Sequence, residues 1–156
     1  QFKNLDDKTI VEYSPMITSY LSEICNLIKR NNGISLNIDY GKNGPYGSTI
    51  QSVYKNKKSL FFENIGESDY SSLVDFNNMK NIIEKNGLFC FPLQTQRDFL
   101  LKMGINFRIE KLALNATNIE KKNLLNSYES LVSKRYMGDL FKVNCFSLKK
   151  FDLLGF

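Results

Sequence analysis

Helix-like and strand-like segments alternate along this chain, and this alternation is the feature that most narrows its possible folds. The first helix is the clearest, because Ser14-Pro15 is a typical helix start and Gly33 a typical stop. Between them, apolar residues recur at helical spacing at positions 17, 20, 21, 24 and 28. The remaining pattern predicts a strand at 34–40, a helix at about 70–86, a strand at 88–93, a short helix from 95 to about 104, a helix that opens at 117–120, and a strand at 140–148. Such alternation predicts an α/β fold with helices on the faces of one sheet.

The composition fits one ordinary globular domain or a part of one. The chain has 156 residues, of which 42% are hydrophobic and 24% charged, and this is enough to bury a core. No run approaches the roughly 18–20 apolar residues of a membrane span, so we expect none. Residues 1–9 are mostly polar with no apolar stretch behind them, so we expect no signal peptide there. Because the first residue is not Met, we expect a longer parent protein.

Missing and scarce residue types exclude several classes of site. Histidine is absent, so this segment offers no imidazole base, no His-based triad and no His metal site, and we expect no metal. Cys25, Cys90 and Cys145 are widely spaced in apolar surroundings, which favours reduced core residues in a reducing compartment. The formal net charge of +5 is modest and does not by itself indicate a nucleic-acid partner.

The end of the strand at 34–40 is the first candidate for a ligand site. Open α/β sheets bind ligands beyond the carboxyl ends of their strands, which selects Asp39, Tyr40 and Gly41. The glycine-rich loop over residues 41–47, which includes Pro45, matches neither G-x-x-x-x-G-K-[ST] nor G-x-G-x-x-G, so nucleotide hydrolysis is disfavoured. A plain surface turn explains the same spacing. Thr49 and Gln51 follow the loop, and either polar side chain could orient a ligand.

Asp75 is the residue that packing explains least. On a helix over 70–86, the apolar arc is formed by Leu73, Phe76, Met79, Ile82 and Ile83. Asp75 falls inside this arc, where a carboxylate needs a partner. The partner is either a structural hydrogen bond or ion pair, or a cationic substrate. Asp69 stands before the same helix, where a role as N-cap explains it fully.

Five motifs in fixed order give the chain a family resemblance. They are D-Y-G at 39–41, G-x-T-[LI]-Q at 47–51, G-x-x-D-L-[TS]-x-x-V-D-F at 66–76, T-Q-x-x-F-L-x-x-[ML]-G-I at 95–105 and M-G-x-x-F at 137–141. The set resembles the MidA-like family of S-adenosylmethionine-dependent protein arginine methyltransferases, from about Glu12 to Leu148. A small departure is Tyr70, where the family motif usually has Leu.

The resemblance implies a partial class I methyltransferase sheet. Residues 34–40, 88–93 and 141–148 would be its strands five, six and seven, with strand seven antiparallel. Residues 1–156 would then be the C-terminal portion of one catalytic domain, and the cofactor-binding half, with its glycine-rich loop, would lie N-terminal to Gln1. The cofactor would be S-adenosylmethionine.

The resemblance also suggests roles for the candidate residues. Asp75 and Asp69 would be the catalytic residues that hold a substrate guanidinium. Tyr40 and Gly41 would contact the cofactor, and Thr49, Gln51 and Asp39 would contact the substrate.

The function predicted from this resemblance is that of one half of a protein methyltransferase, arginine-directed and linked to respiratory complex I assembly. The partner would be a protein substrate, with a complex I subunit as a candidate, in the cytoplasm of a bacterium or the mitochondrial matrix of a eukaryote. We expect the isolated chain to be inactive. Two alternatives stay open at this stage: a non-catalytic interaction module that binds an assembly partner, and half of a nucleotide-binding oxidoreductase.

Overall fold

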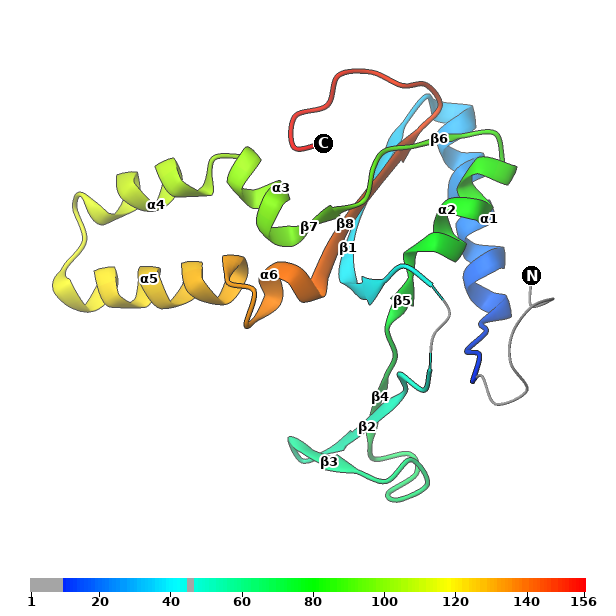
Figure 1. Ribbon diagram of the computed structural model, residues 1–156, viewed down its shortest axis with the longest axis horizontal. Coiled ribbons are helices and arrows are strands. Elements are labelled where there is room, and N and C mark those ends of the chain that lie inside the picture. The colour runs from blue at the N-terminus through cyan, green and yellow to red at the C-terminus, as the bar shows by residue number, and fades with distance from the viewer. Residues whose placement is uncertain (1–9, 45–46) are drawn as a thin grey trace.

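The computed structural model describes residues 10–44 and 47–156, so the expectations for residues 1–9 and Pro45 lie outside the described residues. The elements are α1 (Pro15–Asn31), β1 (Ile34–Lys42), β2 (Gln51–Tyr54), β3 (Lys57–Ser59), β4 (Asp69–Ser71), β5 (Val74–Asp75), α2 (Phe76–Lys85), β6 (Phe89–Cys90), β7 (Gln94–Thr95), α3 (Gln96–Lys102), α4 (Ile105–Ala113), α5 (Asn118–Val132), α6 (Met137–Leu140) and β8 (Phe141–Ser147). Figure 1 shows a central sheet with helices beside it, a second small sheet, and a helical pair that projects from the body. The predicted mixture of helices and strands is confirmed.

β1 and β8 form the middle of the main sheet, whose strand order is β5-β1-β8-β6, with β7 also on β8. β8 runs antiparallel to β1, from Ile34 opposite Ser147 to Tyr40 opposite Phe141. β6 and β7 are both antiparallel to β8 on its other side. The last strand of the chain therefore lies inside the sheet, and its antiparallel course agrees with the prediction.

α1 and α2 pack against each other beside the sheet and enclose the core (Figure 1). The core is formed by Leu21, Cys25, Ile28, Ile82, Ile83, Leu88, Cys90 and Phe146. All three cysteines are buried and free, as predicted from their apolar surroundings. Asn32, in the left-handed conformation, ends α1 directly before Gly33, so the predicted first helix is confirmed almost to the residue.

Two apolar surfaces of the body are covered by no described element. β5 pairs with β1 only at Gly41 and Lys42, so the same edge of β1 from 34 to 40 has no strand neighbour within residues 10–44 and 47–156. The side chains of Ile34, Leu36 and Ile38 are about half exposed. The outward stripe of α1 is apolar as well, and its exposed members are Met16, Ile17, Tyr20, Ile24 and Leu27. The two surfaces lie on opposite sides of the sheet: Phe146 packs on α1, so its partner Ser35 faces α1, and Ile34, Leu36 and Ile38 face the other way. We call these residues together the open surfaces.

The predicted second helix is wrong at its start. α2 begins at Phe76 and not near Tyr70, because residues 69–71 form β4 and pair with β2 instead. Asp75 is the N-cap of α2 and Asp69 is not. The helical wheel that placed Asp75 in an apolar arc therefore included residues that are not helical in the structure.

The segment at 88–93 also differs from prediction. Within the predicted strand at 88–93, only Phe89–Cys90 pairs as β6. A second short pairing, β7, follows Pro92, which has no amide hydrogen to donate to a ladder.

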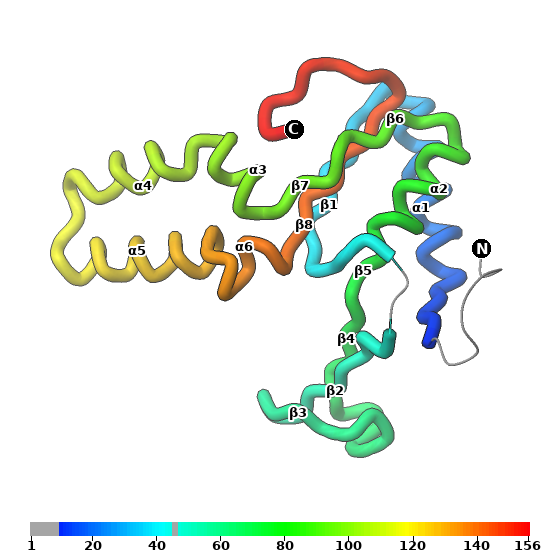
Figure 2. The backbone as a smooth tube through the Cα atoms, in the orientation of Figure 1, coloured from blue at the N-terminus to red at the C-terminus, as the bar shows by residue number. Residues whose placement is uncertain are grey.

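The C-terminal helices α3 and α5 begin where predicted. Thr95 accepts a hydrogen bond from Asp98 N at 3.0 Å and opens α3, and Thr117 with Glu120 forms a capping box that opens α5. α4 was not predicted, and it lies beside α5 in the projecting pair (Figure 2). α5 ends at Val132, and Gly138 lies in a separate short helix, α6. None of the helices described is long and apolar enough to cross a membrane.

Candidate functional site: a pocket between the two sheets

A pocket of about 800 Å3 lies where β1 ends and the second sheet begins. Four stretches supply most of its wall: residues 10–14 before α1, residues 48–50, residues 72–75, and residues 77–79 in the first turn of α2. Lys42 and Gly44 line it from the end of β1. The pocket therefore occupies the carboxyl end of a β-strand, the position where open α/β sheets bind ligands.

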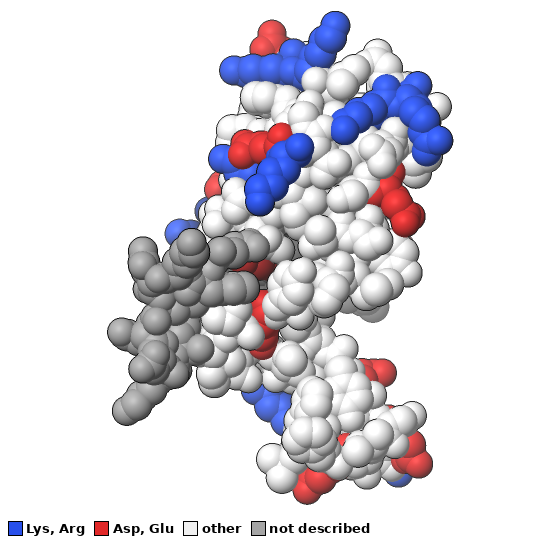
Figure 3. Space-filling view, turned by 90° about the vertical axis from the view of Figure 1, so that its right-hand side faces the viewer, with Lys and Arg blue, Asp and Glu red and all other residues white. Residues whose placement is uncertain are grey.

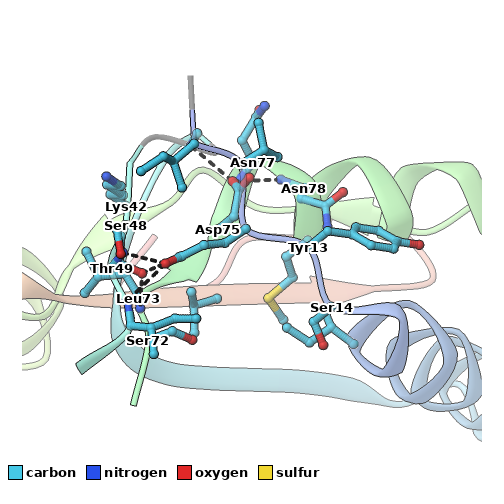
Figure 4. Close-up of a pocket in the computed structure, with 18 of the residues that line it drawn as sticks. Tyr13, Ser14, Lys42, Ser48, Thr49, Ser72, Leu73, Asp75, Asn77 and Asn78 are labelled. Carbon is cyan, nitrogen blue, oxygen red and sulfur yellow. Dashed lines mark hydrogen bonds between the residues drawn. The ribbon is translucent and has the colours of Figure 1, made fainter. Parts of the chain in front are cut away.

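Asp75 fixes the α2 side of this pocket. Its Oδ1 accepts hydrogen bonds from Asn77 N at 3.0 Å and Asn78 N at 3.1 Å, which satisfies two amides at the start of the helix. The same oxygen accepts a third bond from Gly44 N at 3.1 Å. Asp75 thus ties the loop after β1 to the first turn of α2, and Figure 4 shows its carboxylate directed at Asn77 and Asn78.

Glu12 fixes the opposite wall. Its Oε1 accepts hydrogen bonds from Thr49 N at 2.5 Å and Ile50 N at 3.0 Å, and its Oε2 accepts one from Thr49 Oγ1 at 2.5 Å. Burial alone would raise the pKa of this carboxyl, but the bonds from Thr49 and Ile50 and the positive charge of Lys42 outweigh burial and lower it. Glu12 is therefore held as the carboxylate.

Thr49 continues this tie to a third stretch of the wall. Its hydroxyl donates to Glu12 and at the same time accepts a hydrogen bond from Leu73 N at 3.0 Å. Three chain segments that are distant in sequence, around residues 12, 49 and 73, are thereby joined through one hydroxyl group (Figure 4).

The structure brings together only some of the residues predicted for a site. Thr49 and Asp75 line the pocket, but the side chains of both are already engaged in the bonds described above. Asp39, Gln51 and Asp69 are exposed and are not among the lining residues. Asp69 lies in β4 opposite Val53, so the expected pairing of Asp69 with Asp75 on one helix does not occur.

Tyr40 and Gly41, the predicted cofactor contacts, are explained by packing. The Tyr40 ring lies edge-on against Phe141, with centroids 5.6 Å apart. A Cβ at position 41 would lie 2.4 Å from the carbonyl oxygen of Val74 and 2.7 Å from the ring of Phe76. Glycine is therefore required at position 41 by the approach of β5, whether or not a ligand binds nearby.

Glu12 is the pocket residue that sequence reasoning missed. Its hydrogen-bond partners are 37 and 38 positions away, so no local spacing connects them. The only sequence signal was its place just before the Ser14-Pro15 helix start, where a lone Glu has an ordinary surface explanation.

The family of the chain follows from comparison with known proteins. Residues 1–93, more than half of the chain, match the model of a family described as "Putative S-adenosyl-L-methionine-dependent methyltransferase". The chain belongs to this methyltransferase family. It is the MidA-like family that the five motifs resemble, so that prediction is confirmed.

Curated relatives of this methyltransferase family extend the match along most of the chain. The mitochondrial protein arginine methyltransferase NDUFAF7 of Xenopus tropicalis is 30% identical over 133 residues, which cover 85% of this chain and 31% of the relative. Its homologue in Caenorhabditis elegans is 30% identical over 139 residues, with coverage of 86% and 31%. The chain therefore spans about a third of the length of these relatives.

Two solved structures share the fold. An uncharacterised protein from Burkholderia thailandensis superposes with a TM-score of 0.78 at 22% identity, over 88% of this chain and 38% of that chain. A second structure from the same organism, bound to S-adenosyl-homocysteine, gives a TM-score of 0.75 at 21% identity, over 88% and 37%. The fold described above is thus part of a larger known fold.

The described residues do not by themselves make a complete site for S-adenosylmethionine. Gly41 is filled by its neighbours, Tyr40 packs on Phe141, and the pocket carboxylates Glu12 and Asp75 hold backbone amides of the protein itself. Among the residues described, the buried side-chain atom without a hydrogen-bond partner is Asn144 Oδ1. It lies beside Cys90 in the sheet and not in the pocket.

Proposed function

We propose that this chain is part of an S-adenosylmethionine-dependent methyltransferase that modifies arginine in a protein substrate. The observation that carries the proposal is the family match over residues 1–93. The names of the frog and worm relatives, both protein arginine methyltransferases, support the substrate class. The motif resemblance supports the link to respiratory complex I, and the relatives' names support a mitochondrial location if the source is a eukaryote.

On this proposal, the rest of the catalytic domain, with the main cofactor loop, lies outside the chain and covers the open surfaces. β1, β6 and β8 would be strands five, six and seven of a class I methyltransferase sheet. The strand order β1-β8-β6, with β8 antiparallel, supports this assignment. A neighbouring strand would pair with the uncovered edge of β1, and a helix would cover the apolar stripe of α1. Ile34, Leu36 and Ile38 would be buried by a second layer on the sheet face opposite α1.

Asp75 is proposed to hold the substrate guanidinium at the pocket wall. On this proposal, Oδ2 bonds an arginine side chain while Oδ1, which accepts all three hydrogen bonds reported above, keeps the first turn of α2 in place. A carboxylate and a guanidinium form strong, directional hydrogen bonds, and such bonds would fix one substrate nitrogen in position for transfer.

The test of Asp75 is the substitution Asp75→Asn in the full reading frame. Asparagine caps a helix about as well as aspartate, so α2 should remain capped, but the negative charge is lost. We expect methyl transfer from tritiated S-adenosylmethionine to fall by at least about tenfold with an unchanged melting temperature. Full activity in Asp75→Asn would show that Asp75 acts only as a cap.

A second candidate function, a non-catalytic interaction module, is favoured by the incomplete cofactor site. Calorimetry with S-adenosylmethionine separates the two. On the methyltransferase proposal, the chain alone binds weakly or not at all and the full reading frame binds tightly. If the full reading frame also lacks binding, the interaction module is the better description.

A further inference from the structure

The second sheet projects from the body as an arm. We use this name for residues 50–71, which contain β2, β3 and β4 in the order β3-β2-β4. These three strands pack chiefly on one another, and Figures 1 and 3 show the arm as a separate lobe that projects from the body. Both of its ends meet the pocket wall, at residues 48–50 and 72–75.

The end of the arm exposes a cluster of large apolar side chains. Phe61 packs edge-on against Phe62 and Tyr70, with ring centroids 5.0 and 5.1 Å away. The Tyr70 hydroxyl donates to the carbonyl oxygen of Phe61 at 3.0 Å and fixes the two segments together. Even so, Phe62 is 80% exposed, and Leu60 and Ile65 are largely exposed beside it. An ordered cluster of this kind outside a core is typical of a binding surface.

The same end of the arm is acidic although the chain as a whole is basic. Residues 60–71 contain Glu63, Glu67 and Asp69 but no Lys or Arg, in a chain with a formal net charge of +5, whereas the lysines of the arm, Lys55, Lys57 and Lys58, all lie in the preceding β2–β3 hairpin. All three carboxylates are exposed. In Figure 3 the lobe is mostly uncharged, with acidic side chains and a few basic atoms at its margin. Aromatic faces and carboxylates together are the groups that bind a guanidinium, through cation–π contacts and charge-assisted hydrogen bonds.

The outer strand of the arm leads towards the pocket. β4 has a strand neighbour on one side only among the described strands, and an exposed edge of this kind can pair with an extended peptide. From Asp69 the chain continues through Leu73 to Asp75, a path of at most about 20 Å. A peptide that follows this edge would pass from the acidic aromatic end of the arm to the pocket wall.

We propose that the arm docks an extended, arginine-bearing segment of the protein substrate and directs it into the pocket. This inference rests on the proposed function, because it supplies the substrate for that site. One arginine would lie against Phe62 and the carboxylates of Glu63 and Glu67, and a second, about six residues along the peptide, would reach the pocket.

The test is the binding of a labelled peptide to the purified protein encoded by the full reading frame, measured by fluorescence anisotropy. The probe is a short fluorescein-labelled peptide with two arginines about six residues apart, and the control probe has glutamate in place of both. We expect Phe62→Ser, and the double variant Glu63→Gln with Glu67→Gln, to weaken binding of the arginine probe by about tenfold. The matched controls Phe107→Ser, at a residue 78% exposed on α4, and Glu110→Gln should leave it unchanged.

Each result separates this inference from the proposed function. Peptide binding is read without methyl transfer, so it can succeed even if no transfer is found. If transfer occurs, the arm variants should raise the KM for the peptide and leave kcat unchanged. Equal affinities of the arm and control variants, or equal binding of the glutamate probe, would overturn the inference. So would arm variants that only convert a dimer to a monomer in sedimentation, because the arm would then join two copies of the chain.

Discussion

The hydroxyl of Thr49 should control how firmly the arm is attached to the body. Thr49→Val keeps the shape of the side chain but removes its bonds to Glu12 and to Leu73 N. A bond to a charged group contributes about 1.5–3 kcal/mol, and a neutral one about 0.5–1.5 kcal/mol. Because the site is only half-buried, water replaces part of each bond, and the lower ends of these ranges apply. The arm attachment should lose about 2 kcal/mol, which corresponds to a roughly 30-fold increase in opening.

Hydrogen exchange measures this opening directly. Amides of residues 48–75 should exchange roughly 30-fold faster in Thr49→Val, whereas amides of α5 should keep the wild-type rate, because local opening does not require global unfolding. Thr49→Ser is the matched control, since it retains the hydroxyl and loses only a methyl group. Equal protection of residues 48–75 in the valine and serine variants would refute the role assigned to the hydroxyl.

Three further perturbations test other parts of the structure. The pKa of Glu12 is lowered by folding. Its contribution to stability is therefore present above its ordinary pKa and is lost as the pH falls through the lowered value. In urea titrations below pH 4.5, the free energy of unfolding should therefore fall less for Glu12→Gln than for the wild type. Burial, reinforced by the neighbouring Cys90, raises the pKa of Cys145 to about 11. At pH 8, alkylation of the Cys145 thiol should therefore be slow until the protein unfolds. Rapid labelling of Cys145 in the native protein would contradict its buried position. Gly41→Ala should destabilise the protein by about 1–3 kcal/mol in chemical denaturation, because the added Cβ would overlap Val74 O. The control Gly33→Ala should change stability little, because a Cβ there would meet no atom closer than 3.9 Å.

Local signals predicted the helices well because their causes lie within a few residues. Pro15 at the start of α1, the Thr95 cap and the Thr117–Glu120 capping box act over one helical turn, and each is present in the structure. The start of α2 was predicted wrongly because the arm pairs residues distant in sequence. Tyr70 is opposite Ser52 in the β2–β4 ladder, and this non-local pairing overrides the helical pattern.

The candidate site was predictable only in part for the same reason. Thr49 was found because it follows the glycine-rich loop after a strand. Asp75 was found through a helical wheel over residues that are not all helical, and the bonding partners of both were not foreseen. Glu12 reaches across 37 positions to Thr49, and Asp75 reaches across 31 positions to Gly44. Only the folded chain shows that both carboxylates bind the protein's own backbone, and that the pocket wall is assembled from such long-range bonds.

The attachment of the arm has a consequence for how this protein can change over evolution. The arm leaves and re-enters the body at Thr49 and Leu73, which are 24 positions apart in sequence but joined by a 3.0 Å hydrogen bond. The entropy cost of closing a loop rises only slowly with its length, by about 0.6 kcal/mol for each doubling. Insertions, deletions or exchange of the whole arm would therefore leave the two anchor residues and the pocket wall in place. The arm is a segment in which recognition can diverge between lineages while the architecture beneath it stays constant.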